Sequence, residues 1–148
     1  MDSTLFVVDI ERWDWPLHVG IRPASVSQES GLEDALLCSQ SVEIEGLVVE
    51  PEVFRSQRIS LNLTPLPREV IVGDRDQRDV GRLHKDPPAR KDLAFYAMLF
   101  LPEDALANAL FCLGSKWRSI HMWVDDDGQP NSVTDFGFSG NVNTSTDT

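Results

Sequence analysis

Apolar and polar residues alternate one by one in residues 58–64, and this pattern limits the folds open to the chain more than any other feature. Ile59, Leu61 and Leu63 each stand between polar residues, and Pro65 ends the run. Successive side chains of a β-strand point to opposite sides, so the pattern predicts a strand with one buried face and one wet face. Such strands are typical of antiparallel sheets that cover a core from one side.

A second alternating segment spans residues 42–49. Val42 and Ile44 fall on one side of an extended chain, with glutamates between them on the other side, which again predicts a half-buried strand. Gly46 follows on the apolar side, and a glycine within a strand favours a β-bulge at that position.

Other strands are predicted from β-branched and aromatic runs between turn signals. Residues 93–101 are apolar at both odd and even positions, as in a strand covered on both faces. Residues 117–124 and 132–139 are predicted to form two strands, joined by a hairpin loop at 125–131. The remaining candidate strands are residues 4–10, 17–21 and 70–73, with a break at 11–16 between the first two. A weak edge strand is predicted at 80–83, within a charged loop at 74–91.

The clearest helix signal lies at residues 103–113. Pro102 suits the first helical position, where no backbone N–H is needed. Apolar residues recur from there at the spacing of one helix face, and Gly114 stands where helices commonly end. A weaker signal, a serine–glutamate capping box at residues 30–33, predicts either a helix through Cys38 or an irregular edge segment.

These elements predict an α+β fold, built mainly on an antiparallel, sandwich-like β-sheet with one clear helix at about residues 103–113. The strand candidates correspond to about six to eight short strands. A chain of 148 residues fits one domain and can fold without a metal or disulfide. We expect a single globular domain over residues 1–140 and a flexible polar tail at 141–148.

The chain is strongly acidic, with a formal net charge of −11. This charge argues against direct nucleic-acid binding, which needs cations to replace the counterions of phosphate, and against docking on anionic membranes. Residues 1–54 carry −9, from eleven acidic side chains and two arginines. Residues 75–91 carry +3, from six cations and three aspartates, and form either a solvated loop or a local anion-binding patch. The negative net charge of the whole chain favours a basic partner.

The compartment is inferred from cysteine usage and from the start of the chain. Cys38 and Cys112 are far apart and stand beside leucines, so we expect thiols that pack as small apolar side chains. No basic and apolar leader opens the sequence, and no run reaches the ~20 apolar residues that span a bilayer. We therefore expect a cytoplasmic protein without a membrane segment.

Three consecutive aspartates at residues 125–127 precede Gly128 and raise the question of a metal site. An EF-hand calcium loop needs oxygen ligands at fixed positions around its glycine. Aligning Gly128 with that glycine places Trp123 and Thr134 at two ligand positions, so two main ligands are missing. Asp-Gly is a common turn sequence, and we predict a hairpin tip without a metal.

Other catalytic patterns are incomplete as well. No two of the three histidines are spaced for a shared metal ion. Residues 137–141 have the second glycine of a nucleophile elbow one place too early, and no phosphate-binding glycine motif is present. We therefore predict no catalytic residue, no cofactor and no metal, and favour a protein that is not an enzyme.

Tryptophans provide the first candidates for a binding surface, because they are enriched at the centres of protein interfaces. Trp13 and Trp15 lie on one side of an extended segment, with Asp14 between them. Together with the carboxylates of Glu43 and Glu45, they are the predicted binding residues for a basic partner. The alternative is that the indoles seal the edge of the core.

His121 and Trp123 form a second candidate group. They share one face of the strand predicted at 117–124 and stand next to the acidic turn at 125–127. Histidine titrates near neutral pH, so this strand end would suit a small-molecule site or a small enzyme. Simple packing of the histidine against the tryptophan is the alternative.

Three functions follow as hypotheses. The first is a non-enzymatic cytosolic interaction module that neutralises a basic partner, as an immunity protein, antitoxin or inhibitor does. The second is a small-molecule-binding protein or small enzyme, with a pocket between the sheet and the helix near residues 121–127. The third is a structural subunit of a larger assembly, in which a neighbour covers part of the apolar strand at 93–101.

Overall fold

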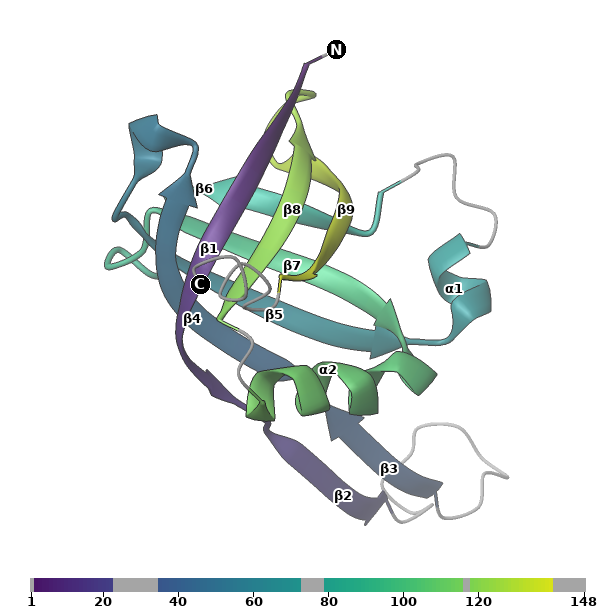
Figure 1. Ribbon diagram of the computed structural model, residues 1–148. Helices are drawn as coiled ribbons and strands as arrows, with labels where there is room; N and C mark the ends of the chain where they lie inside the picture. Colours follow the sequence, from purple (N-terminus) through teal and green to yellow (C-terminus); the bar gives the residue numbers. More distant parts are fainter. Residues whose placement is uncertain (1, 23–34, 73–78, 116–117, 140–148) are drawn as a thin grey trace.

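The computed structural model shows seven strands closed into a barrel, in the order β1-β4-β5-β7-β6-β9-β8, and a separate sheet of two strands (Figure 1). It describes residues 2–22, 35–72, 79–115 and 118–139. The barrel strands are β1 (Ser3–Asp14), β4 (Val42–Glu50), β5 (Arg58–Leu66), β6 (Gly81–Lys85), β7 (Phe95–Pro102), β8 (Ser119–Asp125) and β9 (Asn131–Ser139). The small sheet consists of β2 (Leu17–Arg22) and β3 (Ala35–Gln40).

The predicted sandwich is wrong, because the main sheet closes on itself. β1 pairs with β4 on one side and with β8 on the other, so the strand order has no open end. Alternation tells which face of a strand is buried. It does not tell whether the buried faces belong to two sheets or to one rolled sheet. The mainly β composition with one longer helix does agree with the structure.

A closed barrel with an odd number of strands cannot alternate in direction all the way round, so at least one neighbouring pair must be parallel. That pair is β5 and β7, which run parallel from Ile59–Phe95 to Leu66–Pro102. All the other barrel ladders are antiparallel. The connection from β5 to β7 contains β6, which was predicted as an edge strand and lies instead between β7 and β9.

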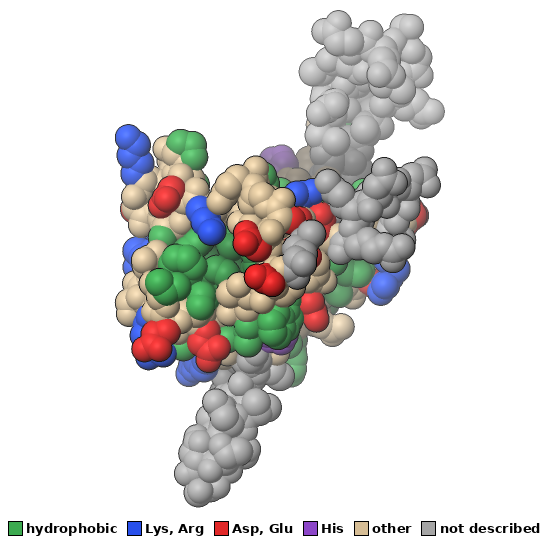
Figure 2. Space-filling view, turned by 90° about the horizontal axis from the view of Figure 1, so that it is seen from above, with side chains coloured by type: hydrophobic (Ala, Val, Ile, Leu, Met, Phe, Trp, Pro, Cys, Tyr) green, Lys and Arg blue, Asp and Glu red, His purple; other side chains and the backbone are tan. Residues whose placement is uncertain are grey.

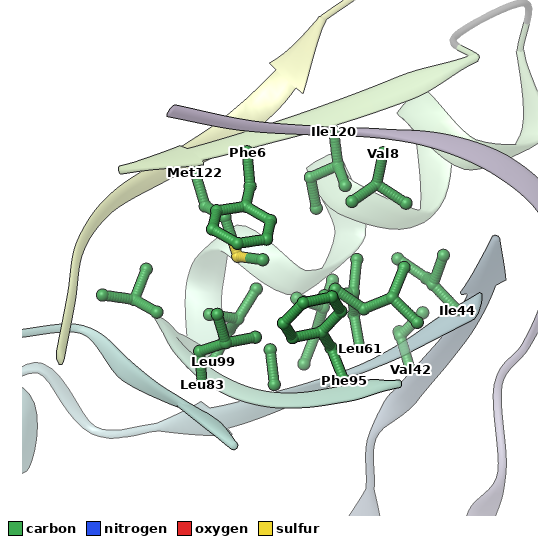
Figure 3. Packing of buried hydrophobic residues seen from close by; sticks show 14 of the residues in the cluster. Phe6, Val8, Val42, Ile44, Leu61, Leu83, Phe95, Leu99, Ile120 and Met122 are labelled. Atoms are coloured by element: carbon green, nitrogen blue, oxygen red, sulfur yellow. The ribbon is translucent and has the colours of Figure 1, made fainter. Parts of the chain in front are cut away.

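Alternate side chains of all the barrel strands fill the interior (Figure 3). Ile59, Leu61 and Leu63 of β5 are fully buried, as their alternation predicted. Ile120 and Met122 of β8 are fully buried too.

A helix closes one end of the barrel. A 3-10 turn, η3 (Glu103–Ala105), leads into α2 (Leu106–Gly114), which confirms the helix predicted at about residues 103–113. Leu106, Ala109 and Leu113 of α2 belong to the core, whereas Phe111 is 73% exposed. β7 ends and β8 begins at this end, while β1 begins at the opposite end, where η2 (Glu52–Phe54) also lies (Figure 1).

Three local predictions are wrong. Residues 70–72 of the strand predicted at 70–73 belong to the helix α1 (Arg68–Val72), because a short apolar run does not distinguish a helix from a strand. The segment through Cys38, for which a helix and an irregular edge segment were both considered, forms strand β3 from Ala35 on, because β2 offers a pairing partner in which Val19 lies opposite Cys38. The outer face of β7 is not covered, since Met98 is 38% exposed on the barrel wall.

Some expectations concern residues outside the described ranges. They are the capping box at 30–33, Gly73 of the strand predicted at 70–73, residues 74–78 of the charged loop, Trp117 of the strand predicted at 117–124, and the polar tail at 141–148. Within the described ranges, no helix is long and apolar enough to cross a membrane.

β1 and β4 form a ribbon that leaves the barrel and continues as β2 and β3. Asp14 pairs with Glu43, and three residues further along each strand Leu17 pairs with Gln40, so the register continues across the junction. A break was predicted at residues 11–16, but only residues 15 and 16 lie between the two strands. The β2–β3 part, named the arm, projects beyond the end of the barrel that α2 closes (Figure 1).

A β-bulge changes which residues of β1 face inward. The ladder skips Glu11, since Ile10 pairs with Gly46 and Arg12 pairs with Glu45. The bulge therefore lies in β1 opposite Gly46, and not in β4 as the sequence suggested. Before the bulge, even-numbered residues of β1 point into the barrel; beyond it, odd-numbered residues take that side.

Candidate functional site

Exposed apolar side chains run from the rim of the barrel along one side of the arm. The bulge places the odd-numbered residues on this side, which continues the inner face of the barrel past its end. Their exposed fractions rise outward, from 38% for Trp13 to 68% for Ile21. The apolar stripe, as we name it, consists of Trp13, Trp15, Leu17, Val19 and Ile21.

Trp15 is held in place at the junction between barrel and arm. Its backbone N–H donates a hydrogen bond to Asp14 Oδ1 at 2.9 Å, and its indole Nε1 donates to Gln40 Oε1 at 3.2 Å. The ring remains 41% exposed. A side chain that is fixed before binding loses less conformational entropy when a partner covers it, so Trp15 is suited to act as an anchor.

Asp14 and Glu43 lie directly opposite each other on the other face of the ribbon, and both are exposed. Like charges in opposed cross-strand positions destabilise a sheet. A hollow of about 290 Å³ at this point is lined by the two carboxylates together with Arg12, Trp13 and Glu45. A cation placed at this hollow would relieve the repulsion between Asp14 and Glu43.

Glu45 differs from the other predicted acidic residues, because arginines already neutralise it. Arg12 Nη2 lies 2.6 Å from its Oε1, and guanidinium nitrogens of Arg58 and Arg90 lie 3.6 Å from its carboxylate oxygens. The hydrogen bond from Arg12, followed by the charges of the arginines, lowers the pKa of Glu45 below its ordinary value. Glu45 therefore ties β4 to neighbouring segments, and its charge is already balanced by arginines.

Replacing Glu45 by glutamine should lower the free energy of unfolding at pH 7 by about 1 kcal/mol, since the group is partly exposed. Because its folded pKa lies below the ordinary value of 4.5, the stabilisation is fully present above that pH. It is lost as the pH falls through the folded pKa. Urea unfolding from pH 7 downward should therefore show E45Q and the parent converging in acid.

Asp135→Asn, on the exposed side of β9, is the matched control and should differ little from the parent at any pH. A difference between E45Q and the parent that stays constant down to acid would show that the arginine contacts of Glu45 do not stabilise the fold.

His121 and Trp123 lie on the outer wall of the barrel. They alternate along β8 with the buried Ile120 and Met122, so their side chains are directed away from the core. His121 lies opposite Gly137, where a Cβ would come within 3.0 Å of the imidazole Cε1. Neither His121 nor Trp123 lines the cavity that opens at the nearby end of the barrel. The structure therefore does not place them in the expected pocket between sheet and helix.

The aspartates at 125–127 belong to the hairpin between β8 and β9, as predicted. Asp127 Oδ1 accepts a hydrogen bond from the backbone N–H of Ser132 at 2.9 Å, and hydrogen bonds from Ser132 lower the pKa of Asp127. Asp125 Oδ1 accepts from Ser3 Oγ at 2.6 Å. In the part of the chain that the structure describes, no three His, Cys, Asp or Glu side chains converge as metal ligands.

Sequence reasoning missed the outer part of the apolar stripe. Residues 17–21 were predicted to form a strand, and the period of two of Leu17, Val19 and Ile21 was the available signal for the stripe. That signal gave no indication that the apolar side of the strand stays exposed, because the exposure arises where the ribbon passes the end of the barrel.

A closed barrel with a projecting two-stranded arm and an apolar stripe can be compared with known proteins by sequence and by structure. No protein-family model, no curated protein and no solved structure matches this chain.

Proposed function

We propose that this protein is a non-enzymatic interaction module of the cytosol that binds a basic protein partner through its arm. The apolar stripe carries this proposal, since its side chains become more exposed with distance from the barrel, up to 68% at Ile21. Monomeric soluble proteins rarely expose contiguous apolar patches above roughly a few hundred Å². A stripe that begins with two tryptophans has the composition of an interface centre.

Charge favours a basic partner over a second copy of the chain. The net charge of −11 makes two copies repel each other, whereas it attracts a basic surface over a distance. Asp14 and Glu43 lie on the opposite face of the ribbon from the stripe, and they repel each other until a cation approaches. Proteins that act in this way, such as inhibitors, immunity proteins and antitoxins, neutralise a partner by covering its basic surface.

The arm also has backbone groups with which a partner can pair. Among the described strands, β2 and β3 pair only with each other. Unpaired N–H and C=O groups along a strand edge accept an extended segment of another protein, and the adjacent side chains then provide specificity. We expect the partner to pack apolar side chains on the stripe while its cations reach Asp14 and Glu43 on the opposite face of the same ribbon.

The test is affinity capture from the native host with the parent protein, followed by binding kinetics with the captured partner. Leu17→Ser with Ile21→Ser should accelerate dissociation, because the variant removes apolar contact area. Asp14→Lys with Glu43→Lys should slow association about tenfold at low salt, and high salt should reduce this effect.

Asp135→Lys, a charge reversal on an exposed position of β9, is the control and should leave association close to that of the parent. Capture of an acidic partner, or equal kinetics for the parent and both arm variants, would refute the proposal. Circular dichroism should first show that every variant retains the barrel.

A further inference from the structure

A cavity opens at the end of the barrel opposite α2 and the arm. Its volume is about 250 Å³, slightly below the ~300 Å³ at which typical ligand pockets begin. Figure 2 looks onto this end and shows hydrophobic side chains in the middle, with acidic and basic side chains around them. Mouths of β-barrels are common places for small-molecule sites.

The floor of the cavity is the apolar core itself. Phe6, Leu83 and Val124 line it, with exposed fractions of 3%, 0% and 5%. Phe54 of η2 forms part of the wall, and its ring stacks on that of Phe6 with 6.0 Å between the centroids. A ligand in the cavity therefore meets two aromatic rings and aliphatic side chains.

One polar group on the cavity wall has an unused hydrogen-bonding capacity. Asn131 is 4% exposed, and its Nδ2 donates to the backbone oxygen of Asp125 at 3.1 Å. Its buried Oδ1 accepts no hydrogen bond from any residue in the described ranges. Buried polar atoms nearly always have a partner, so a donor supplied by a ligand would complete the environment of this oxygen.

The charges around the opening are mainly negative. Asp2, Asp125 and Asp126 line the cavity, and Lys85 is the single cation among the lining residues. The ammonium of Lys85 lies 5.9 Å from the centre of the Phe54 ring, within the range of a cation–π interaction with that ring. The net charge of these four side chains favours a cationic ligand over an anionic one.

We propose that this cavity binds a small protonated amine with an apolar or aromatic body. The ammonium group donates a hydrogen bond to Asn131 Oδ1 and interacts with the aspartates, while the body packs on Phe6 and Phe54. A quaternary ammonium ion can interact with the charges of the aspartates, but it has no N–H to donate to Asn131 Oδ1. The cavity and the arm lie at opposite ends of the barrel, so this inference does not depend on the proposed partner.

Titrations followed by 15N–1H NMR test the site with five probes. Benzylamine should bind with a Kd on the order of 1 mM, as suits a fragment, and shift signals of residues around the cavity. Benzyl alcohol, which lacks the charge, and benzyltrimethylammonium, which lacks the N–H donors, should each bind at least about tenfold more weakly. Benzoate should not bind. N-acetyl-lysine methylamide distinguishes a free amine from a lysine side chain of another protein, and it should bind more weakly because it has no aromatic body.

Two variants locate the binding groups. Asn131→Leu keeps the approximate shape and removes the acceptor, and Asp126→Asn removes one charge at an exposed position; each should weaken benzylamine about tenfold. Asp135→Asn, on the outer side of β9, should bind as the parent does. The proposal would be overturned if benzylamine and benzyl alcohol bound equally well. It would also be overturned if benzylamine at ten times the expected Kd caused no shifts around the cavity. Asp126→Asn keeps the test valid if Asn131→Leu does not fold.

Discussion

Replacing Gly46 by alanine should lower the free energy of unfolding by about 3 kcal/mol, the upper end of the range for overpacked interiors. A Cβ at this position would lie 2.1 Å from the backbone oxygen of Asp9 and 3.1 Å from Val8 Cγ1. β1 cannot simply move away, because β8 holds the same residues from the other side, with Asp9 opposite Ser119. The strain therefore has to spread through the barrel.

Urea unfolding of the parent and Gly46→Ala measures this effect, and the melting temperature should fall by roughly 10 °C. Gly114→Ala is the matched control, since a Cβ at the end of α2 meets no described atom within 4 Å. Alanine favours a helix over glycine by about 0.5–1 kcal/mol, so the control should be unchanged or slightly more stable. A Gly46→Ala protein as stable as the parent would be incompatible with the close approach of β1 and β4.

Replacing Phe95 by alanine should cost about 3–5 kcal/mol, the usual range for a large buried aromatic side chain. Phe95 is 2% exposed and meets both other rings of the aromatic cluster edge to face, Phe6 at 5.4 Å and Phe54 at 5.0 Å between centroids. Its removal leaves a void among the core side chains, and the surrounding strands are held by their ladders and cannot collapse into it.

Phe54→Ala is the comparison, because Phe54 lies in η2 and is only partly buried. It should cost clearly less than Phe95→Ala when both are measured by urea unfolding. A double-mutant cycle between Phe6 and Phe95 should give a coupling of about 0.5–1.5 kcal/mol. Equal costs for Phe54→Ala and Phe95→Ala would mean that the cluster is not centred on Phe95.

Local patterns in the sequence predicted most of the strands and the inward face of β5. The period of two identified Ile59, Leu61 and Leu63 as core, and the helical spacing after Pro102 identified α2. Closure was not predictable in this way, because it depends on the pairing of β1 with β8, more than a hundred residues apart. The strand tilt and stagger that allow such a pairing are properties of the whole sheet, and no single segment encodes them.

The candidate site was predictable only in part, for a similar reason. The sequence indicated that Asp14 and Glu43 belong to an acidic region, and the structure places them opposite each other. It did not indicate that Glu45 is neutralised, because Arg58 and Arg90 reach it from β5 and from the loop before β7. Likewise, Asn131 carries no local signal, since its unpaired oxygen is a consequence of how several strand ends meet.

The double pairing of β1 also sets the order in which the fold can be completed. β1 and β4 are close in the sequence and can form their ribbon early, because little chain entropy is lost in closing a short loop. The inner face of β1 stays open to water until β8 arrives from the far part of the chain. Proteins dominated by such distant contacts fold slowly, so the barrel becomes enclosed only in a late and cooperative step.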